Sequence, residues 1–217
     1  MKNKALATRT LVFAALLMVF ACGATAQEEH VWYFNDGPQD ASDGTWTDSG
    51  MGILWEHMGP TDIEADDNDC SIMDLPPDGV PIWACSDPDA GDYTDQHWWA
   101  EIWLANNYEA HSNAVTATLG LGACGQAAGF TAISQPVTGN VTSYMGDFTC
   151  GEMYGFDFGN LALVQPAGES LIVRIVSEGE PYDVHIYWDA WTAPSALHCG
   201  PSTATDSRSW SMVKALY

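Results

Sequence analysis

The stretch His97-Trp98-Trp99-Ala100-Glu101-Ile102-Trp103-Leu104 alternates between two kinds of side chain. The apolar set is Trp98, Ala100, Ile102 and Leu104, and the polar and aromatic set is His97, Trp99, Glu101 and Trp103. Successive side chains of a β-strand point to opposite faces of its sheet. The stretch therefore predicts a strand with one face in a hydrophobic core and the other face outside it.

Similar signals recur along the chain, and helical periodicity is nearly absent. In the segment 184–191, Val184, Ile186 and Trp188 alternate with His185, Tyr187, Asp189 and Trp191. Further strands are predicted at 31–34, 114–121 and 171–176, with turns such as Asn35-Asp36-Gly37-Pro38 between them. Short strands separated by turns predict an all-β fold, an antiparallel two-sheet β-sandwich of the jelly-roll or immunoglobulin-like kind.

The first 26 residues have the features of a secretory signal peptide. Lys2, Lys4 and Arg9 precede an apolar run at 11–21, and Ala24-Thr25-Ala26 fits a small-x-small cleavage site. Residues 27–217 are then expected to form a single secreted domain with no transmembrane span. An alternative is a lipoprotein anchored through Cys22, which follows Val19-Phe20-Ala21, and another is an uncleaved anchor.

Residues 27–217 contain 29 acidic residues but only three basic ones, Arg174, Arg208 and Lys214. This balance excludes a nucleic-acid partner and docking on anionic lipid, because both need clustered positive charge. Eighteen of the carboxylates fall in residues 27–95, which are also rich in glycine and proline. The N-terminal half is therefore expected to be acidic and loop-rich.

One acidic run suggests a cation site. Calcium takes six to eight oxygen ligands from carboxylates and carbonyls on flexible loops. The candidate ligands are Asp62, Glu64, Asp66, Asp67 and Asp69. Their spacing does not match an EF-hand, so the alternative is a solvated acidic surface without a metal.

Export to an oxidising compartment predicts disulfides among the five cysteines after residue 26. The favoured pairs are Cys70–Cys85 and Cys124–Cys150, which close short loops between predicted strands. Cys199 would then be buried alone or joined to another chain.

The C-terminal part carries a resemblance. The run Gly168 to Ile175, then Gly179, Val184 to Asp189 and Pro194 to Leu197, resembles the end of prokaryotic secreted β-sandwich domains of cell-surface and envelope proteins. The resemblance implies a sandwich at the cell surface. It supplies no catalytic residues that could be carried over to this chain.

The order histidine, aromatic, acid, tryptophan occurs twice, at 97–103 and at 185–191. If the two strands lie on one sheet, their shared face is an aromatic and acidic platform suited to stacking against sugars. The candidate carbohydrate-binding residues are Trp99, Glu101, Trp103, Tyr187, Asp189 and Trp191. The alternative is that these side chains only cover a half-exposed sheet face.

Catalytic motifs are lacking, since the sequence contains neither GxSxG nor HExxH. The first hypothesis is a non-enzymatic secreted or cell-envelope protein with a structural or adhesive role, whose partners are polysaccharide or other envelope proteins. The second is a carbohydrate-binding module, with calcium as its cofactor. The third is a glycoside hydrolase, because a carboxylate pair separated in sequence would leave no recognisable motif.

Overall fold

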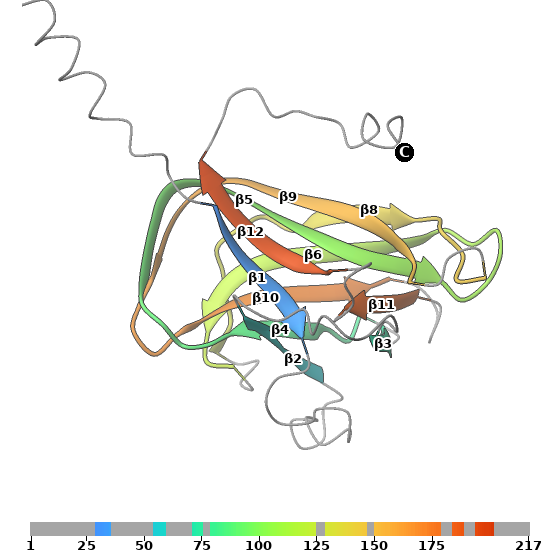
Figure 1. Cartoon of the computed structure of the whole chain (residues 1–217), viewed down its shortest axis with the longest axis horizontal. Helices are drawn as coiled ribbons and strands as arrows, with labels where there is room; N and C mark the ends of the chain where they lie inside the picture. The colour runs from blue at the N-terminus through green and yellow to red at the C-terminus, as the bar shows by residue number, and fades with distance from the viewer. Residues whose placement is uncertain are drawn as a thin grey trace, which may run out of the picture.

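The computed structural model describes residues 29–35, 54–59, 71–75, 79–124, 129–146, 150–178, 184–188 and 194–201. These residues form an all-β structure (Figure 1). The strands are β1 (His30–Asn35), β2 (Leu54–Gly59), β3 (Ser71–Asp74), β4 (Ile82–Ser86), β5 (Gly91–Asn106), β6 (Asn113–Gly122), β7 (Thr131–Ala132), β8 (Val137–Val141), β9 (Glu152–Gln165), β10 (Ser170–Ser177), β11 (Val184–Trp188) and β12 (Ala196–Pro201).

The predicted two-layer sandwich is confirmed. In the first layer, one edge of β5 pairs with β9. The other edge pairs with β12 and, further along β5, with β11. The layer continues with β1 beyond β12 and with β3 beyond β11. The second layer contains β4, β10 and β6, with β7 and β8 on the far edge of β6. Every pairing is antiparallel except β2–β4, which is parallel and joins the two layers through β1.

The core lies between the layers, where the apolar set of β5 is fully buried. Trp98 is 0% exposed, and its ring stacks on Trp32 of β1 at 5.7 Å and 11°. Facing residues come from the second layer, among them Leu119 of β6 and Val173 of β10. The alternation predicted for 97–104 is thus the observed division between the core and the outer face.

The pairing of β5 fixes which side chains meet on the outer face. Opposite residues of paired strands project to the same side of the sheet. Trp99 lies opposite His198 of β12 and opposite Asp157 of β9, and Trp103 lies opposite Tyr187 of β11. The two strands with the repeated histidine–aromatic order are therefore direct neighbours.

A β-bulge in β9 shapes the same region. Trp98 pairs with Gly159 and Trp99 with Asp157, so Phe158 is an extra residue in β9. Gly159 has a φ of 78°, a conformation that glycine adopts without steric cost. Its N–H donates a 2.7 Å hydrogen bond to Oδ1 of Asp157. The bulge thereby orients the Asp157 carboxylate beside β5.

In the described part of the chain, no helix is both long and apolar enough to cross a bilayer.

Candidate functional site

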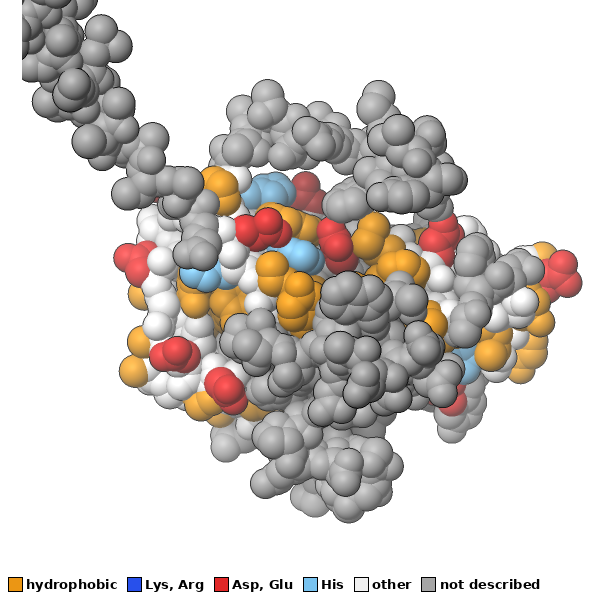
Figure 2. Space-filling view, viewed as in Figure 1, with side chains coloured by type: hydrophobic (Ala, Val, Ile, Leu, Met, Phe, Trp, Pro, Cys, Tyr) orange, Lys and Arg blue, Asp and Glu red, His pale blue; other side chains and the backbone are white. Residues whose placement is uncertain are grey.

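We define the β5 surface as the outward side chains of β5 with their cross-strand neighbours. Its members are His97, Trp99, Glu101 and Trp103 of β5, His198 of β12, Tyr187 of β11, and Met153, Gly155 and Asp157 of β9. Figure 2 shows histidine, acidic and hydrophobic side chains close together on the face over β12 and β5. The strand pairing is what collects these residues, because they come from four separate segments.

Trp99 is the centre of the polar end of this surface. The imidazole of His198 stacks on its indole, with ring centroids 4.9 Å apart and an interplanar angle of 7°. Nδ1 of His198 lies 3.1 Å from Oε1 of Glu29, and Nε2 lies 3.7 Å from Oε2 of Glu101. Glu29 therefore holds the ring that covers one face of Trp99, and the Glu101 carboxylate lies near its other nitrogen without a hydrogen bond.

A second imidazole approaches Trp99 from its own strand. The His97 ring is tilted by 34° to Trp99, with centroids 5.7 Å apart. Nε2 of His97 lies 3.2 Å from Oδ1 of Asp157, and Nδ1 lies 3.3 Å from the side-chain oxygen of Asn160. Trp99 is thus bordered by two histidines, each held by groups from a neighbouring strand.

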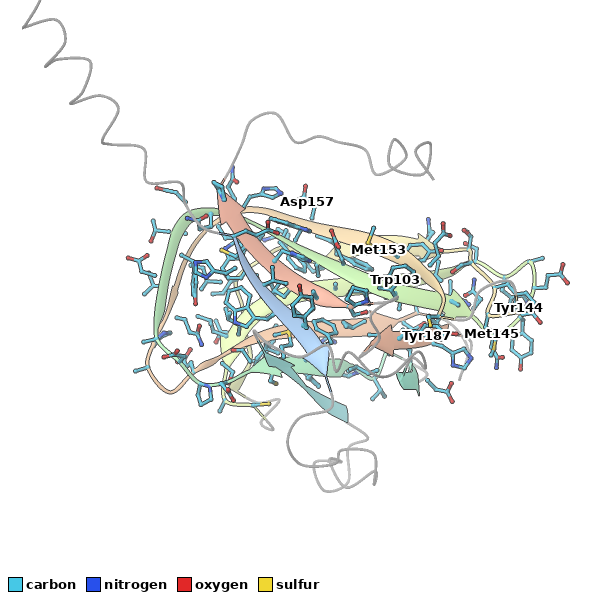
Figure 3. All side chains as sticks on the ribbon, viewed as in Figure 1. Trp103, Tyr144, Met145, Met153, Asp157 and Tyr187 are labelled. Carbon is cyan, nitrogen blue, oxygen red and sulfur yellow. The ribbon has the colours of Figure 1, made fainter. Side chains whose placement is uncertain are left out.

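The apolar end is formed by Trp103, with Tyr187 on one side and Met153 on the other (Figure 3). Tyr187 is only 1% exposed, and burial raises the pKa of its phenol above the ordinary value. Ser195 Oγ donates a 2.5 Å hydrogen bond to the Tyr187 carbonyl and accepts one of 3.0 Å from the Trp103 N–H. Tyr187 therefore packs beside half-buried Trp103 and presents little ring surface to a ligand.

Between its two ends the β5 surface has open space at Gly155, which we call the open step. Gly155 lies opposite Glu101, and a Cβ atom built on it would meet none of the described residues within 4 Å. The Glu101 side chain keeps 17% exposure beside this space. Trp99 and Trp103 are four residues apart on one strand, which separates their Cα atoms by about 13 Å. Both indoles could be reached only by a ligand longer than one sugar ring.

The structure brings together four of the six predicted carbohydrate-binding residues: Trp99, Glu101, Trp103 and Tyr187. The other two, Asp189 and Trp191, lie outside the described residues, as do Asp62, Glu64, Asp66, Asp67 and Asp69 of the predicted calcium site. Within the described ranges, no group of three His, Cys, Asp or Glu side chains could hold a metal ion.

Glu29, Asp157 and His198 belong to the site although the sequence pattern did not indicate them. They reach Trp99 and its histidines only through the pairing of β1, β9 and β12.

Of the two predicted cysteine pairs, only Cys124–Cys150 lies within the described residues. Cys150 packs with Ala105 at one end of β5, near the start of β6, whereas Cys124 follows the other end of β6. The ten residues of β6 span about 30 Å, and a disulfide needs Cα atoms within about 7 Å. The pair Cys124–Cys150 is therefore incompatible with the fold. Cys150 does form a disulfide. Cys70, the partner predicted for Cys85, lies outside the described residues.

Cys199 is a thiol buried in the core at 0% exposure, as one of the two alternatives expected. Burial raises the pKa of this thiol to about 12.

No family model matches the chain. No curated protein matches it either. Among solved structures, a CocE/NonD-family hydrolase from Staphylococcus aureus is similar with a TM-score of 0.46 and 10% identity, over 81% of this chain and 36% of that one. An α-L-arabinofuranosidase, MgGH51, is similar with a TM-score of 0.38 and 14% identity, over 64% of this chain and 21% of that one.

The capsid protein VP2 of infectious bursal disease virus is similar with a TM-score of 0.23 and 13% identity, over 66% of this chain and 41% of that one. This chain spans less than two thirds of each of these proteins. These are distant structural similarities to β-rich proteins and carry nothing about activity. The resemblance to secreted prokaryotic surface domains stays a prediction.

Proposed function

We propose that the protein is a non-enzymatic adhesive module of the cell surface, and that it holds a polysaccharide on the β5 surface. The observation that supports this most is the placement of Trp99, Glu101 and Trp103 on one outer face, with the open step at Gly155 beside them. Indole rings pack against the apolar faces of sugars, and carboxylates accept hydrogen bonds from hydroxyl groups.

Weak binding is expected from this arrangement. One face of Trp99 is already covered by His198, and Trp103 is half-buried, so each indole offers only part of its surface. Each contact would contribute roughly 1 kcal/mol, by analogy with aromatic pairs. Two such contacts, after the entropy of association, correspond to millimolar to high-micromolar affinity. A polymer that offers many equivalent sites would be retained better than a free sugar.

The hydrolase alternative would rest on Glu101 and Asp157, two carboxylates on the same face. A general acid in a glycosidase needs an environment that keeps it protonated, as an apolar pocket does. The Asp157 side chain is 70% exposed and lies 3.2 Å from a histidine nitrogen. So exposed a side chain does not lie in such a pocket, which supports binding over hydrolysis.

The test is retention on insoluble amorphous cellulose, xylan and chitin. The Trp99→Ala, Trp103→Ala double variant should bind about 30-fold more weakly than the wild type, because roughly 2 kcal/mol of contact is removed. Depletion isotherms measure the effect, and the unfolding midpoint checks that the variant is folded. Tyr108→Ala is the matched control, because Tyr108 is an aromatic residue 53% exposed on a loop beyond the β5 surface.

Glu101→Gln keeps the size of the side chain and removes one charge, so it tests the surface without removing an aromatic ring. We expect it to weaken binding a few-fold through loss of a charged acceptor. If the wild type is retained on none of the three polymers, or if Tyr108→Ala weakens binding as much as the double variant, the carbohydrate proposal fails.

Calcium remains a separate expectation that rests on residues outside the described ranges. Millimolar calcium should raise the melting temperature, because a ligand bound only by the native state stabilises it. Magnesium should act less, since it gives up its water reluctantly. The Asp66→Asn, Asp67→Asn double variant should lose the effect. Equal stabilisation by calcium, magnesium and sodium at matched ionic strength would indicate general charge screening instead.

A further inference from the structure

We infer that the polysaccharide held on the β5 surface is a polymer of amino sugars, and that the Glu101 carboxylate accepts the ammonium group of one sugar unit. This inference rests on the proposed function, because it names the substrate class of the same surface. It starts from the position of Glu101, which lies on β5 midway between Trp99 and Trp103 and opposite the open step at Gly155.

The Glu101 carboxylate lacks a hydrogen-bond donor among the described residues. Its side chain is only 17% exposed. Nε2 of His198 lies 3.7 Å from Oε2 of Glu101, which is too far for a hydrogen bond. A carboxylate that is largely withdrawn from water is costly unless it is paired or hydrogen-bonded. A donor on the ligand would therefore supply the contact that this side chain lacks within the described protein.

The open step gives a ligand the room to reach this carboxylate. A Cβ atom built on Gly155 would meet none of the described residues within 4 Å. The next outward residues of β9 are Met153, opposite Trp103, and Asp157, opposite Trp99. A small substituent on a sugar fits in the space between them, while the ring that carries it packs against an indole.

The charge around the open step favours an ammonium group over a neutral donor. Glu29, Glu101 and Asp157 lie around Trp99, on a chain whose formal charge is -23. Among the described residues the only lysine or arginine is Arg174, which lies on β10 in the other layer. No lysine or arginine is visible on the face shown in Figure 2.

Both a hydroxyl and an ammonium group can donate a hydrogen bond to a carboxylate, but the two differ in strength. The bond from an ammonium group is charge-assisted at both ends, and the negative potential of the surface attracts the cation as well. An acidic sugar would be repelled by the same carboxylates. The amino sugar is therefore the substrate class that this surface fits best.

The experiment compares three soluble tetrasaccharides that have the same linkage and differ in one substituent on each ring. Cellotetraose carries a hydroxyl group there, chitotetraose an acetamide and the glucosamine tetramer a primary amine. NMR titrations at pH 7.0, below the pKa of an ordinary primary amine, give the dissociation constants at constant ionic strength. The wild type should bind the glucosamine tetramer about five-fold more tightly than either neutral tetramer, through the charge-assisted hydrogen bond.

Two variants test the site from different sides. Glu101→Gln removes the carboxylate, and its affinities for the three tetramers should agree within about two-fold. Gly155→Val fills the open step without removing a charge and should abolish the preference as well, which keeps the test decisive if Glu101→Gln does not fold. Glu109→Gln is the matched control, because it removes the same charge from an exposed residue beyond the end of β5 and should keep the preference. The unfolding midpoint checks that each variant is folded.

Tetralysine tests whether positive charge alone is recognised. It carries primary amines but no sugar ring, so it offers no ring face to Trp99 or Trp103. The wild type should bind it more weakly than the glucosamine tetramer. Equal or tighter binding of tetralysine would mean that the surface selects cations of any kind, and the inference would be overturned.

The remaining outcomes separate the inference from the proposed function. If the wild type is retained on the insoluble polymers but binds the three tetramers equally, the inference is overturned and the proposed function stands. A preference that Glu109→Gln lowers as much as Glu101→Gln also overturns the inference, because the net charge of the chain would then be its cause. Absence of binding to every tetramer and every polymer removes the proposed function and the inference with it.

Discussion

Replacing Trp98 by alanine should lower the free energy of unfolding by about 3–5 kcal/mol, the usual cost of truncating a buried tryptophan. Trp98 is 0% exposed, and its ring packs against Trp32 and Tyr93. The same substitution at the next residue, Trp99, should cost only about 1 kcal/mol, because its ring lies on the outer face and loses mainly the stack with His198.

Urea denaturation of the two variants checks this contrast, since both lose the same side chain from adjacent positions of β5. Similar losses in both would mean that the β5 surface is covered and structural, and the binding proposal would then lose its basis. The contrast also decides whether weaker retention of the Trp99→Ala, Trp103→Ala double variant reflects lost ligand contacts or a destabilised fold.

Alkaline pH should destabilise the protein strongly through Cys199. Its pKa is raised to about 12 by burial, whereas a thiol in the unfolded chain titrates near pH 9. The neutral thiol is retained in the folded state, so this contribution to stability is fully present below pH 9. It is lost as the pH rises from 9 towards 12, at about 1.4 kcal/mol per pH unit and about 4 kcal/mol in total.

The measurement is the urea midpoint between pH 7 and pH 10, after brief incubation so that thiol–disulfide exchange does not intervene. Burial also raises the pKa of Tyr93 and Tyr187, but their contribution begins only near pH 10. Cys199→Ala should therefore abolish most of the decline between pH 9 and 10. If this variant shows the same decline as the wild type, the thiol is not its cause.

The alternation of β5 could be predicted from the sequence because a strand buried on one face repeats with a period of two. The strands at 31–34, 114–121 and 171–176 could be predicted for a related reason, since they are rich in β-branched or aromatic residues. These local signals sufficed for the fold class and for the division of β5 into a core face and an outer face.

Strand neighbours could not be predicted in the same way. The order of strands is decided by packing between distant segments, and it is this order that brings His198 and Asp157 to Trp99. The strand β9 could not be predicted from the sequence, because Gly155 and Gly159 interrupt its alternation and glycine is a poor strand former. Those glycines have structural uses, one at the open step and one at the bulge.

The predicted pair Cys124–Cys150 illustrates the same limit. Cys124 and Cys150 are close in sequence, which favours their pairing by loop-closure entropy. The strands between them run along the length of the sandwich, so Cys124 and Cys150 lie far apart in the fold although they are close in sequence.

The pairing of β1 with β12 has a consequence for the order of events during synthesis. His30 pairs with Cys199 and Tyr33 with Ala196, so the first described strand needs the last one as its neighbour. A ribosome makes β1 long before β12, and the aromatic segment Val31-Trp32-Tyr33-Phe34 must wait without that partner. Until β12 has been made, the edge of β1 that faces it stays unpaired. Release of the C-terminal strand from the ribosome is then the event that completes this part of the first layer.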